Sequence, residues 1–211
     1  MDLSNLKIHF LGDSITQGYF AETKSSSYVG RFQSQYPNAT IRNYGVGGSC
    51  ISNTCVWNVE DMRARAKRME PDADLIVVCG GSNDFFCLTP LGSPDERTED
   101  TFFGAYNLLL DDLIARYPNT KIVLCTILPR FDEALPECDG RVRIAPPIAY
   151  VDIIKKIGEL RNLPVIDLFT LECFREPIPG DKSPLTKDGL HPLDEGHKIL
   201  FNRIHQALLS L

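Results

Sequence analysis

The chain has 211 residues, of which 43% are hydrophobic and 24% are charged, so it is long enough for one compact domain to bury its own core. We therefore expect a single domain over residues 1–211. The formal net charge of -6 argues against nonspecific binding to nucleic acid or insertion at an anionic membrane, because both reward a basic face. A small-molecule substrate fits this charge better.

The seven cysteines lack the spacing of a metal or redox site. No CxxC pair occurs, and an odd number cannot form a complete set of internal disulfides. We interpret them as small buried residues in a reducing compartment and expect a cytoplasmic protein. The sequence shows no basic-then-apolar leader and no apolar stretch long enough to span a bilayer. Secretion after removal of a signal peptide stays open, as does the oligomeric state.

Short runs of branched and aromatic residues, which predict buried strands, alternate with longer segments that predict helices. In chain order these are strand Lys7–Leu11, helix Ser26–Tyr36, strand Thr40–Tyr44, helix Val56–Met69, strand Leu75–Cys79, helix Thr101–Tyr117, strand Lys121–Thr126, helix Ile148–Leu160, strand Pro164–Ile166 and helix Glu195–Leu209. Such alternation predicts an α/β fold with a parallel sheet covered on both faces, because right-handed crossovers place the helices there.

Ligands of open parallel sheets bind beyond the carboxyl ends of the strands, so the segments that follow strands are of most interest. Two of these connections, residues 85–100 and 129–145, are longer than a tight turn needs. Their apolar side chains would either face a substrate or pack onto the core: Phe85, Phe86, Leu88, Leu91, Phe131 and Leu135. We take Phe85, Phe86 and Phe131 as candidate substrate-binding residues.

The first predicted strand runs directly into the segment Gly12-Asp13-Ser14-Ile15-Thr16-Gln17-Gly18. This order would present Ser14 at a strand-to-helix turn, where its hydroxyl faces the ligand crevice, and the two glycines relieve crowding around the turn. Serine is also favoured as a helix N-cap for purely structural reasons. Ser14 is therefore a candidate nucleophile only in the company of a base.

A candidate base occurs just before the last predicted helix, in the segment Asp188-Gly189-Leu190-His191-Pro192. A serine hydroxyl is a poor nucleophile until an imidazole takes its proton, and a carboxylate fixes the imidazole tautomer. With two residues between them, Asp188 and His191 can reach the crevice from one turn. A lone Asp-x-x-His is also typical of a surface loop, so the interpretation depends on Ser14.

Two more strand ends carry groups that could stabilise an oxyanion. The second strand leads into Asn43-Tyr44-Gly45-Val46-Gly47-Gly48-Ser49, whose glycines allow close approach of a main-chain N–H. The third leads into Gly80-Gly81-Ser82-Asn83-Asp84, where Asn83 offers a side-chain amide. Turn formation alone would also explain glycine and asparagine at these positions.

These four segments, GDSITQG, NYGVGGS, GGSND and DGLHP, closely resemble in this order the four blocks of the SGNH hydrolases, the class that includes the GDSL-type esterases and lipases. The resemblance extends over positions 12 to 192. It implies a flavodoxin-like three-layer α/β/α sandwich with a five-stranded parallel sheet of strand order 2-1-3-4-5. It also implies a small-molecule ester substrate, no metal and no organic cofactor.

The resemblance further implies roles for individual residues. Ser14 corresponds to the nucleophile, His191 to the base and Asp188 to the acid that orients it. The oxyanion hole would consist of the main-chain N–H groups of Ser14 and Gly48 and the side chain of Asn83. The adjacent Gly47 is the alternative donor.

The function that we expect is a serine esterase that forms an acyl-enzyme and removes short-chain acyl or O-acetyl groups. A lysophospholipase or thioesterase is the alternative within this class. An α/β-hydrolase proper would carry its nucleophile in Gly-x-Ser-x-Gly, which Ser14 does not. A non-catalytic flavodoxin-like binding module would not explain the Asp188 and His191 pair. We interpret His9, His197 and His205 as packing residues, and Asp13 and Asp84 as braces for their loops.

Overall fold

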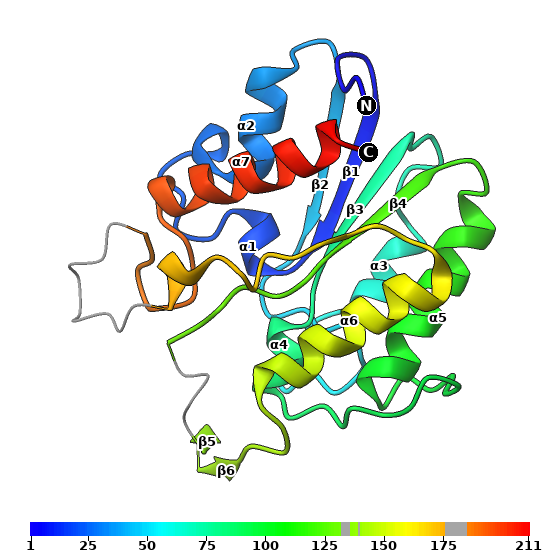
Figure 1. Cartoon of the computed structure of the whole chain (residues 1–211), viewed down its shortest axis with the longest axis vertical. Coiled ribbons are helices and arrows are strands. Elements are labelled where there is room, and N and C mark those ends of the chain that lie inside the picture. Colours follow the sequence, from blue (N-terminus) through cyan, green and yellow to red (C-terminus); the bar gives the residue numbers. More distant parts are fainter. Residues whose placement is uncertain (132–135, 139, 176–184) are drawn as a thin grey trace.

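The structure, a computed structural model, describes residues 1–131, 136–138, 140–175 and 185–211. Its centre is a parallel sheet with helices on both faces (Figure 1). The strands of this sheet are β1 (Lys7–Gly12), β2 (Thr40–Gly45), β3 (Leu75–Cys79), β4 (Lys121–Cys125) and β7 (Val165–Ile166). They lie in the order β2-β1-β3-β4-β7, which is 2-1-3-4-5 when only these strands are counted. The expected flavodoxin-like α/β fold is confirmed.

The register of the strands aligns their carboxyl ends at one edge of the sheet. Gly12 at the end of β1 is paired with Gly45 of β2 and with Cys79 of β3, and Cys79 is paired with Cys125 of β4. The segments that follow β1, β2 and β3 therefore leave the sheet side by side. All three candidate segments from the first half of the chain meet at this edge.

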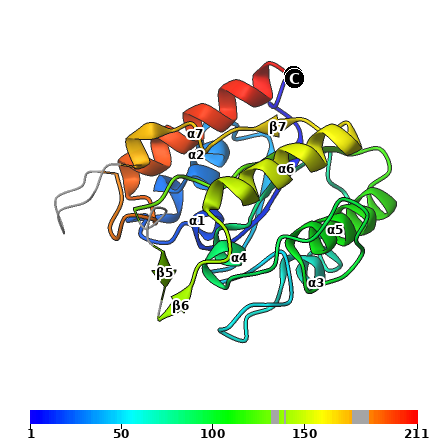
Figure 2. The same ribbon diagram turned by 60° about the horizontal axis from the view of Figure 1, so that its bottom comes forward.

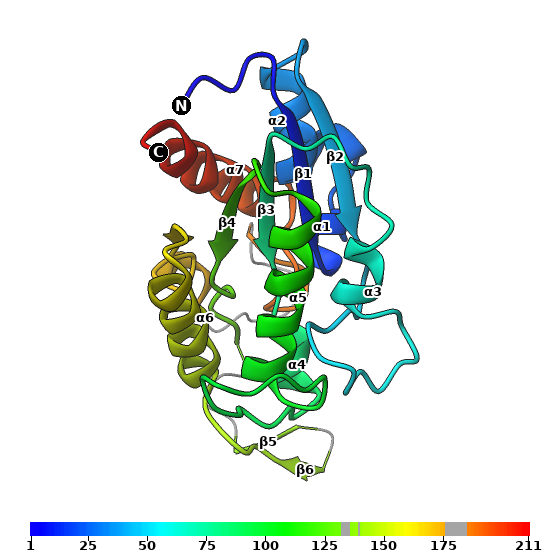
Figure 3. The same cartoon turned by 90° about the vertical axis from the view of Figure 1, so that its right-hand side faces the viewer.

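Helices of the two outer layers bury one apolar core on each face of the sheet. Helices α2 (Tyr28–Gln35) and α7 (Asp194–Leu209) cover one face, and α3 (Met62–Ala66), α5 (Phe102–Arg116) and α6 (Pro147–Arg161) cover the other (Figures 1 and 3). The core beneath α2 and α7 includes Phe10, Tyr28, Phe32, Leu200 and Ile204. The core beneath α3, α5 and α6 includes Ile76, Phe102, Tyr106, Leu110 and Ile154. Among the described residues, no helix is long and apolar enough to cross a membrane.

Several short elements were not predicted because they are too short to show a hydrophobic period. Helices α1 (Ser14–Gln17) and α4 (Ser82–Phe86) begin directly after β1 and β3, and two 3-10 turns occupy Lys24–Ser26 and Glu172–Phe174. The hairpin of β5 (Glu137–Cys138) and β6 (Arg141–Val142) projects beside α4 (Figure 2). It is anchored there by Arg141, which donates a hydrogen bond to the carbonyl of Phe86.

The predicted helix over Val56–Met69 is wrong over its first half, because α3 begins only at Met62. Asn58 has a φ of +53°, a left-handed conformation that a right-handed helix cannot include. The Asp61 side chain then accepts a hydrogen bond of 2.7 Å from the Ala64 N–H and so caps the start of α3. As a result, residues 56–61 form an irregular segment in which Val56 and Trp57 are exposed.

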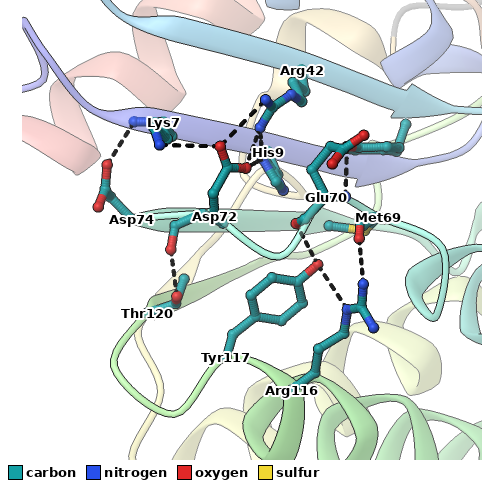
Figure 4. Close-up of polar contacts among 12 residues, drawn as sticks. Lys7, His9, Arg42, Met69, Glu70, Asp72, Asp74, Arg116, Tyr117 and Thr120 are labelled. Atoms are coloured by element: carbon teal, nitrogen blue, oxygen red, sulfur yellow. Dashed lines mark hydrogen bonds and ion pairs between the residues drawn. The ribbon is translucent and has the colours of Figure 1, made fainter.

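The opposite, amino-terminal edge of the sheet is tied by a polar cluster (Figure 4). The Asp72 carboxylate forms ion pairs with Lys7, at 3.1 Å, and with Arg42. Arg42 also donates to Nε2 of His9 at 3.0 Å, and His9 is fully buried. Burial, together with the Arg42 cation, lowers the pKa of His9 to about 4. His9 thus packs as a neutral side chain far from the carboxyl edge.

Candidate active site

Ser14 is the first residue of α1, in the turn formed by residues 12–18, which we call the Ser14 turn. The N-cap of α1 is Asp13, whose side chain accepts a hydrogen bond of 3.0 Å from the Ile15 N–H. The hydroxyl of Ser14 is therefore not used for capping. The turn requires glycine at position 12, because a Cβ there would lie 2.0 Å from Oγ1 of Thr16.

The structure brings Ser14 together with the two residues from the far end of the chain. Oγ of Ser14 lies 2.9 Å from Nε2 of His191, and Nδ1 of His191 lies 2.6 Å from Oδ2 of Asp188. If Nδ1 carries the proton, it donates to the Asp188 carboxylate and leaves Nε2 free to accept from Ser14. This is the arrangement in which an imidazole can take a proton from a serine hydroxyl.

The loop of residues 186–192, which we call the histidine loop, is shaped by Asp188 itself. Oδ1 of Asp188 accepts hydrogen bonds from the main-chain N–H groups of Leu190, at 3.1 Å, and His191, at 2.8 Å. Burial acts to raise the pKa of Asp188, but the hydrogen bonds from the His191 ring and from these N–H groups outweigh it and lower the pKa to about 2. Asp188 is therefore a carboxylate at neutral pH.

The segment of residues 45–49, which we call the glycine loop, presents a main-chain donor beside Ser14. The Gly47 N–H donates to Oε1 of Gln17 at 2.7 Å and is thus occupied. The Gly48 N–H has no hydrogen-bond partner within the described part of the chain, and the positive φ of Gly48, +77°, favours glycine there. Of the two neighbouring glycines, Gly48 is the one with an N–H to offer.

Asn83, in α4, contacts the end of the glycine loop. Its Nδ2 donates to the carbonyl of Ser49 at 3.0 Å. An amide nitrogen carries two hydrogens, so this contact fixes the side chain and leaves the second N–H for a ligand. The next residue, Asp84, is fully buried and accepts from the main-chain N–H groups of Ile51, at 2.9 Å, and Ser52, at 3.0 Å. Asp84 braces this segment as expected.

These groups surround one open pocket of 370 Å³. It is lined by Ser14, Gln17, Tyr19, Gly47, Gly48, Trp57, Asn83 and His191. Two exposed aromatic side chains border it. The ring of Tyr19 lies 5.0 Å from that of His191, whereas Trp57 stands on the side of the glycine loop and stacks on Phe86 at 5.0 Å. Gln17, Tyr19 and Trp57 were not among the predicted site residues.

The three phenylalanines predicted to bind substrate have different surroundings. Phe86 stacks against the ring of Trp57. Phe131 is 52% exposed and packs against Gly189 of the histidine loop. Phe85 is only 1% exposed and lies under the Arg143 guanidinium, 4.0 Å from its ring centre. Its prediction is therefore corrected, because a ring packed in the core cannot face a substrate. Leu135 lies outside the described residues.

The histidines of α7, His197 and His205, make structural contacts. His197 is buried, and its Nδ1 accepts from the Tyr28 N–H at 3.3 Å, while Nε2 of His205 lies 2.6 Å from the Tyr36 hydroxyl. Burial raises the pKa of Asp13 to about 6.

Within the described ranges, no group of three or more His, Cys, Asp or Glu side chains is arranged to hold a metal ion.

Comparisons with known proteins define the class. Residues 10–199 match the model of the GDSL-like Lipase/Acylhydrolase family. The solved structures that resemble this chain include a protein from Lactobacillus plantarum, which is 23% identical with a TM-score of 0.83, each chain being covered over 99% of its length. A possible lipase from Chitinophaga pinensis DSM 2588 is 21% identical with a TM-score of 0.74, over 97% of this chain and 98% of the other.

An acetyl xylan esterase, AlAXEase, is 22% identical with a TM-score of 0.67, over 96% of this chain and 99% of the other. No curated protein sequence matches the chain. The fold and the matched residues together define a hydrolase of the acylhydrolase class. The chain belongs to the GDSL-like Lipase/Acylhydrolase family, which its four sequence blocks indicated.

Proposed function

We propose that this protein is a serine esterase that removes short acyl groups, acetyl above all, from hydroxyl-bearing substrates. The observation that carries the proposal is the continuous chain of contacts from Asp188 through His191 to Ser14, at 2.6 Å and 2.9 Å. It ends in a pocket that is also lined by Gly48 and Asn83. The proposed nucleophile, its proposed base and the proposed oxyanion donors therefore line one cavity, which supports the proposal.

In the first half of the reaction, Nε2 of His191 takes the Ser14 proton as Oγ attacks the ester carbonyl carbon. Asp188 holds the Nδ1 proton and stabilises the imidazolium that forms. The carbonyl oxygen becomes an oxyanion, which the N–H groups of Ser14 and Gly48 and the Asn83 amide bind. His191 then gives its proton to the leaving alcohol oxygen, the C–O bond breaks, and an acyl ester of Ser14 is left.

In the second half, water takes the place of the alcohol. Nε2 of His191 removes a proton from the water as its oxygen attacks the acyl carbon, and the same donors bind the second oxyanion. His191 returns the proton to Oγ of Ser14 as the acyl–enzyme bond breaks. The carboxylic acid leaves and the starting state is restored. No metal or organic cofactor takes part in these steps.

The lining of the pocket supports a polar substrate with a short acyl group. Apart from Tyr19 and Trp57, the pocket is lined by glycines and by the polar side chains of Ser14, Gln17, Asn83 and His191. A long acyl chain would need an extended apolar surface, whereas an aromatic platform beside polar groups suits a sugar ring. The similarity in fold to an acetyl xylan esterase agrees with this choice.

A panel of substrates tests the proposal. We would compare p-nitrophenyl acetate, butyrate and octanoate, acetylated xylose, lysophosphatidylcholine and an acyl-CoA thioester, with Ser14→Ala as the control. We expect hydrolysis that is fastest for acetyl esters and is lost in Ser14→Ala. A rate that rises with chain length would instead favour a lysophospholipase or thioesterase. Binding without turnover of any substrate would favour a non-catalytic module.

A further inference from the structure

A buried arginine on α3 joins two parts of the site that are far apart in the sequence. Arg65 is 6% exposed, and its Nη2 donates to the carbonyl of Gly12, the first residue of the Ser14 turn, at 2.8 Å. Its Nη1 donates to Oγ of Ser49, in the glycine loop, at 3.1 Å, and makes a longer contact of 3.4 Å with the carbonyl of Glu60. One guanidinium therefore contacts both the Ser14 turn and the glycine loop.

Ser49 is the point at which these contacts converge. It follows Gly48, the candidate oxyanion donor, and its carbonyl accepts the hydrogen bond that orients Asn83. Its hydroxyl accepts from Arg65 and donates to the carbonyl of Glu60 at 3.0 Å. A shift of Ser49 would therefore displace two oxyanion donors relative to the Ser14 hydroxyl.

We propose that Arg65 is a positioning residue for ester hydrolysis, which sets the distance between the Ser14 hydroxyl and the oxyanion donors by holding Gly12 and Ser49 together. The inference rests on the proposed esterase function. Arg65 does not contact substrate, since it is absent from the pocket lining. It acts through Gly48 and Asn83, whose donors must match the position of the oxyanion to within a fraction of an ångström.

A contribution to folding stability alone does not explain the buried guanidinium of Arg65. Desolvation penalises a buried guanidinium, and Nε of Arg65 has no hydrogen-bond partner among the described residues. If the guanidinium is removed, its acceptors keep other partners. The Gly12 carbonyl still accepts from the Val46 N–H at 3.1 Å, and the Ser49 hydroxyl still donates to Glu60. An apolar side chain of similar length should thus leave the fold intact.

The test compares Arg65→Met with Arg63→Met as a matched control. Arg63 lies on the same helix, but it forms ion pairs with Asp112, at 2.7 Å, and Glu99, at 2.6 Å, away from the pocket. For each protein we would measure kcat and KM on p-nitrophenyl acetate, the Kd of phenylboronic acid, which forms a tetrahedral adduct with an active serine, and Tm.

We expect Arg65→Met to lower kcat by roughly 10–100-fold and to weaken phenylboronic acid binding by a similar factor, with KM within about twofold of wild type. Its Tm should lie no lower than that of Arg63→Met, which keeps wild-type kcat. Arg65→Lys, which keeps the charge but cannot reach both acceptors, should give an intermediate rate. Adding Ser49→Ala to Arg65→Met should cost little more than either change alone, because both remove the same contact.

Wild-type kcat and phenylboronic acid affinity in folded Arg65→Met would overturn the inference while leaving the esterase proposal intact. Fully additive effects of Arg65→Met and Ser49→Ala would also contradict it. If Arg65→Met does not fold, Ser49→Ala and Arg65→Lys decide the question by the same readouts. A wild-type protein without ester hydrolysis would instead refute the proposed function.

Discussion

Asn83 carries two amide N–H groups, of which one already has a partner in the Ser49 carbonyl. The second N–H forms its strongest hydrogen bond only when the substrate oxygen becomes charged. Removal of the Asn83 amide should therefore destabilise the transition state more than it weakens substrate binding. We predict that Asn83→Ala lowers kcat by roughly 10²–10³-fold, with a much smaller change in KM. Steady-state kinetics on p-nitrophenyl acetate check this. A change confined to KM would give Asn83 a role in binding alone.

Asp188 uses its two oxygens for different tasks, which a single substitution can separate. In Asp188→Asn, Oδ1 can still accept from the main-chain N–H groups of Leu190 and His191 and preserve the loop. The amide nitrogen then faces Nδ1 of His191 and favours the wrong tautomer. We predict a rate loss of roughly 10²–10⁴-fold with an unchanged Tm. Activity near wild type would show that Asp188 only shapes the loop.

Loss of His191 should remove most of the hydrolysis rate. Nε2 of His191 lies 2.9 Å from Oγ of Ser14, and without this ring the serine hydroxyl loses the base that takes its proton. Asp188, with a pKa lowered to about 2, stays charged between about pH 4 and 9. We predict that His191→Ala removes most of the rate over this range. The measurement is kcat/KM of both proteins between about pH 4 and 9, and a variant that keeps near-wild-type values would assign the base elsewhere.

At the scale of elements, sequence patterns located the long strands and helices but not the short ones that carry the site. A helix such as α5 has a regular apolar stripe, whereas α1 and α4 are single turns that depend on caps and on glycine conformations. The irregular segment of residues 56–61 was predicted as helix because the positive φ of Asn58 cannot be inferred from the pattern of hydrophobic residues. Trp57, which borders the pocket, was missed for this reason.

Trp57 stands on a segment held by stacking on Phe86, so it offers a test of substrate preference. If it supports the alcohol part of the substrate, Trp57→Ala should raise KM for phenyl acetate by about 3–10-fold, with little effect on methyl acetate. Trp57→Phe, which keeps an aromatic face, should restore most of the affinity. Equal losses on both esters would mean that Trp57 supports Gly48 rather than the substrate.

At the scale of the whole molecule, the alternation of strands and helices predicted the layers, and the resemblance to SGNH hydrolases supplied the strand order. The catalytic candidates could be found because each follows a strand or precedes the last helix in a short motif. Gln17, Tyr19 and Arg65 could not, because their roles depend on contacts between segments. The occupation of the Gly47 N–H by Gln17, for example, exists only in the folded chain.

The buried His9 should make the folded state sensitive to acid. Its pKa is about 4 in the fold and 6.5 as a free side chain, so between these values only the unfolded chain binds the proton. The stability associated with neutral His9 is complete above about pH 6.5 and is lost toward pH 4, by roughly 3 kcal/mol. We predict that His9→Phe, which can pack between Tyr44 and Tyr117, loses less stability over this range. Urea unfolding at pH 7 and 4.5 checks this, and equal losses in both proteins would contradict it.

The central claim is that Ser14 is a nucleophile activated by His191 and Asp188. A fluorophosphonate probe reacts covalently with such a serine, and mass spectrometry of the labelled peptides identifies the residue that carries it. We predict one adduct per chain, on Ser14, that is absent in Ser14→Ala and forms far more slowly in His191→Ala. An adduct on another residue, or ester hydrolysis that persists while Ser14 stays unlabelled, would contradict the account.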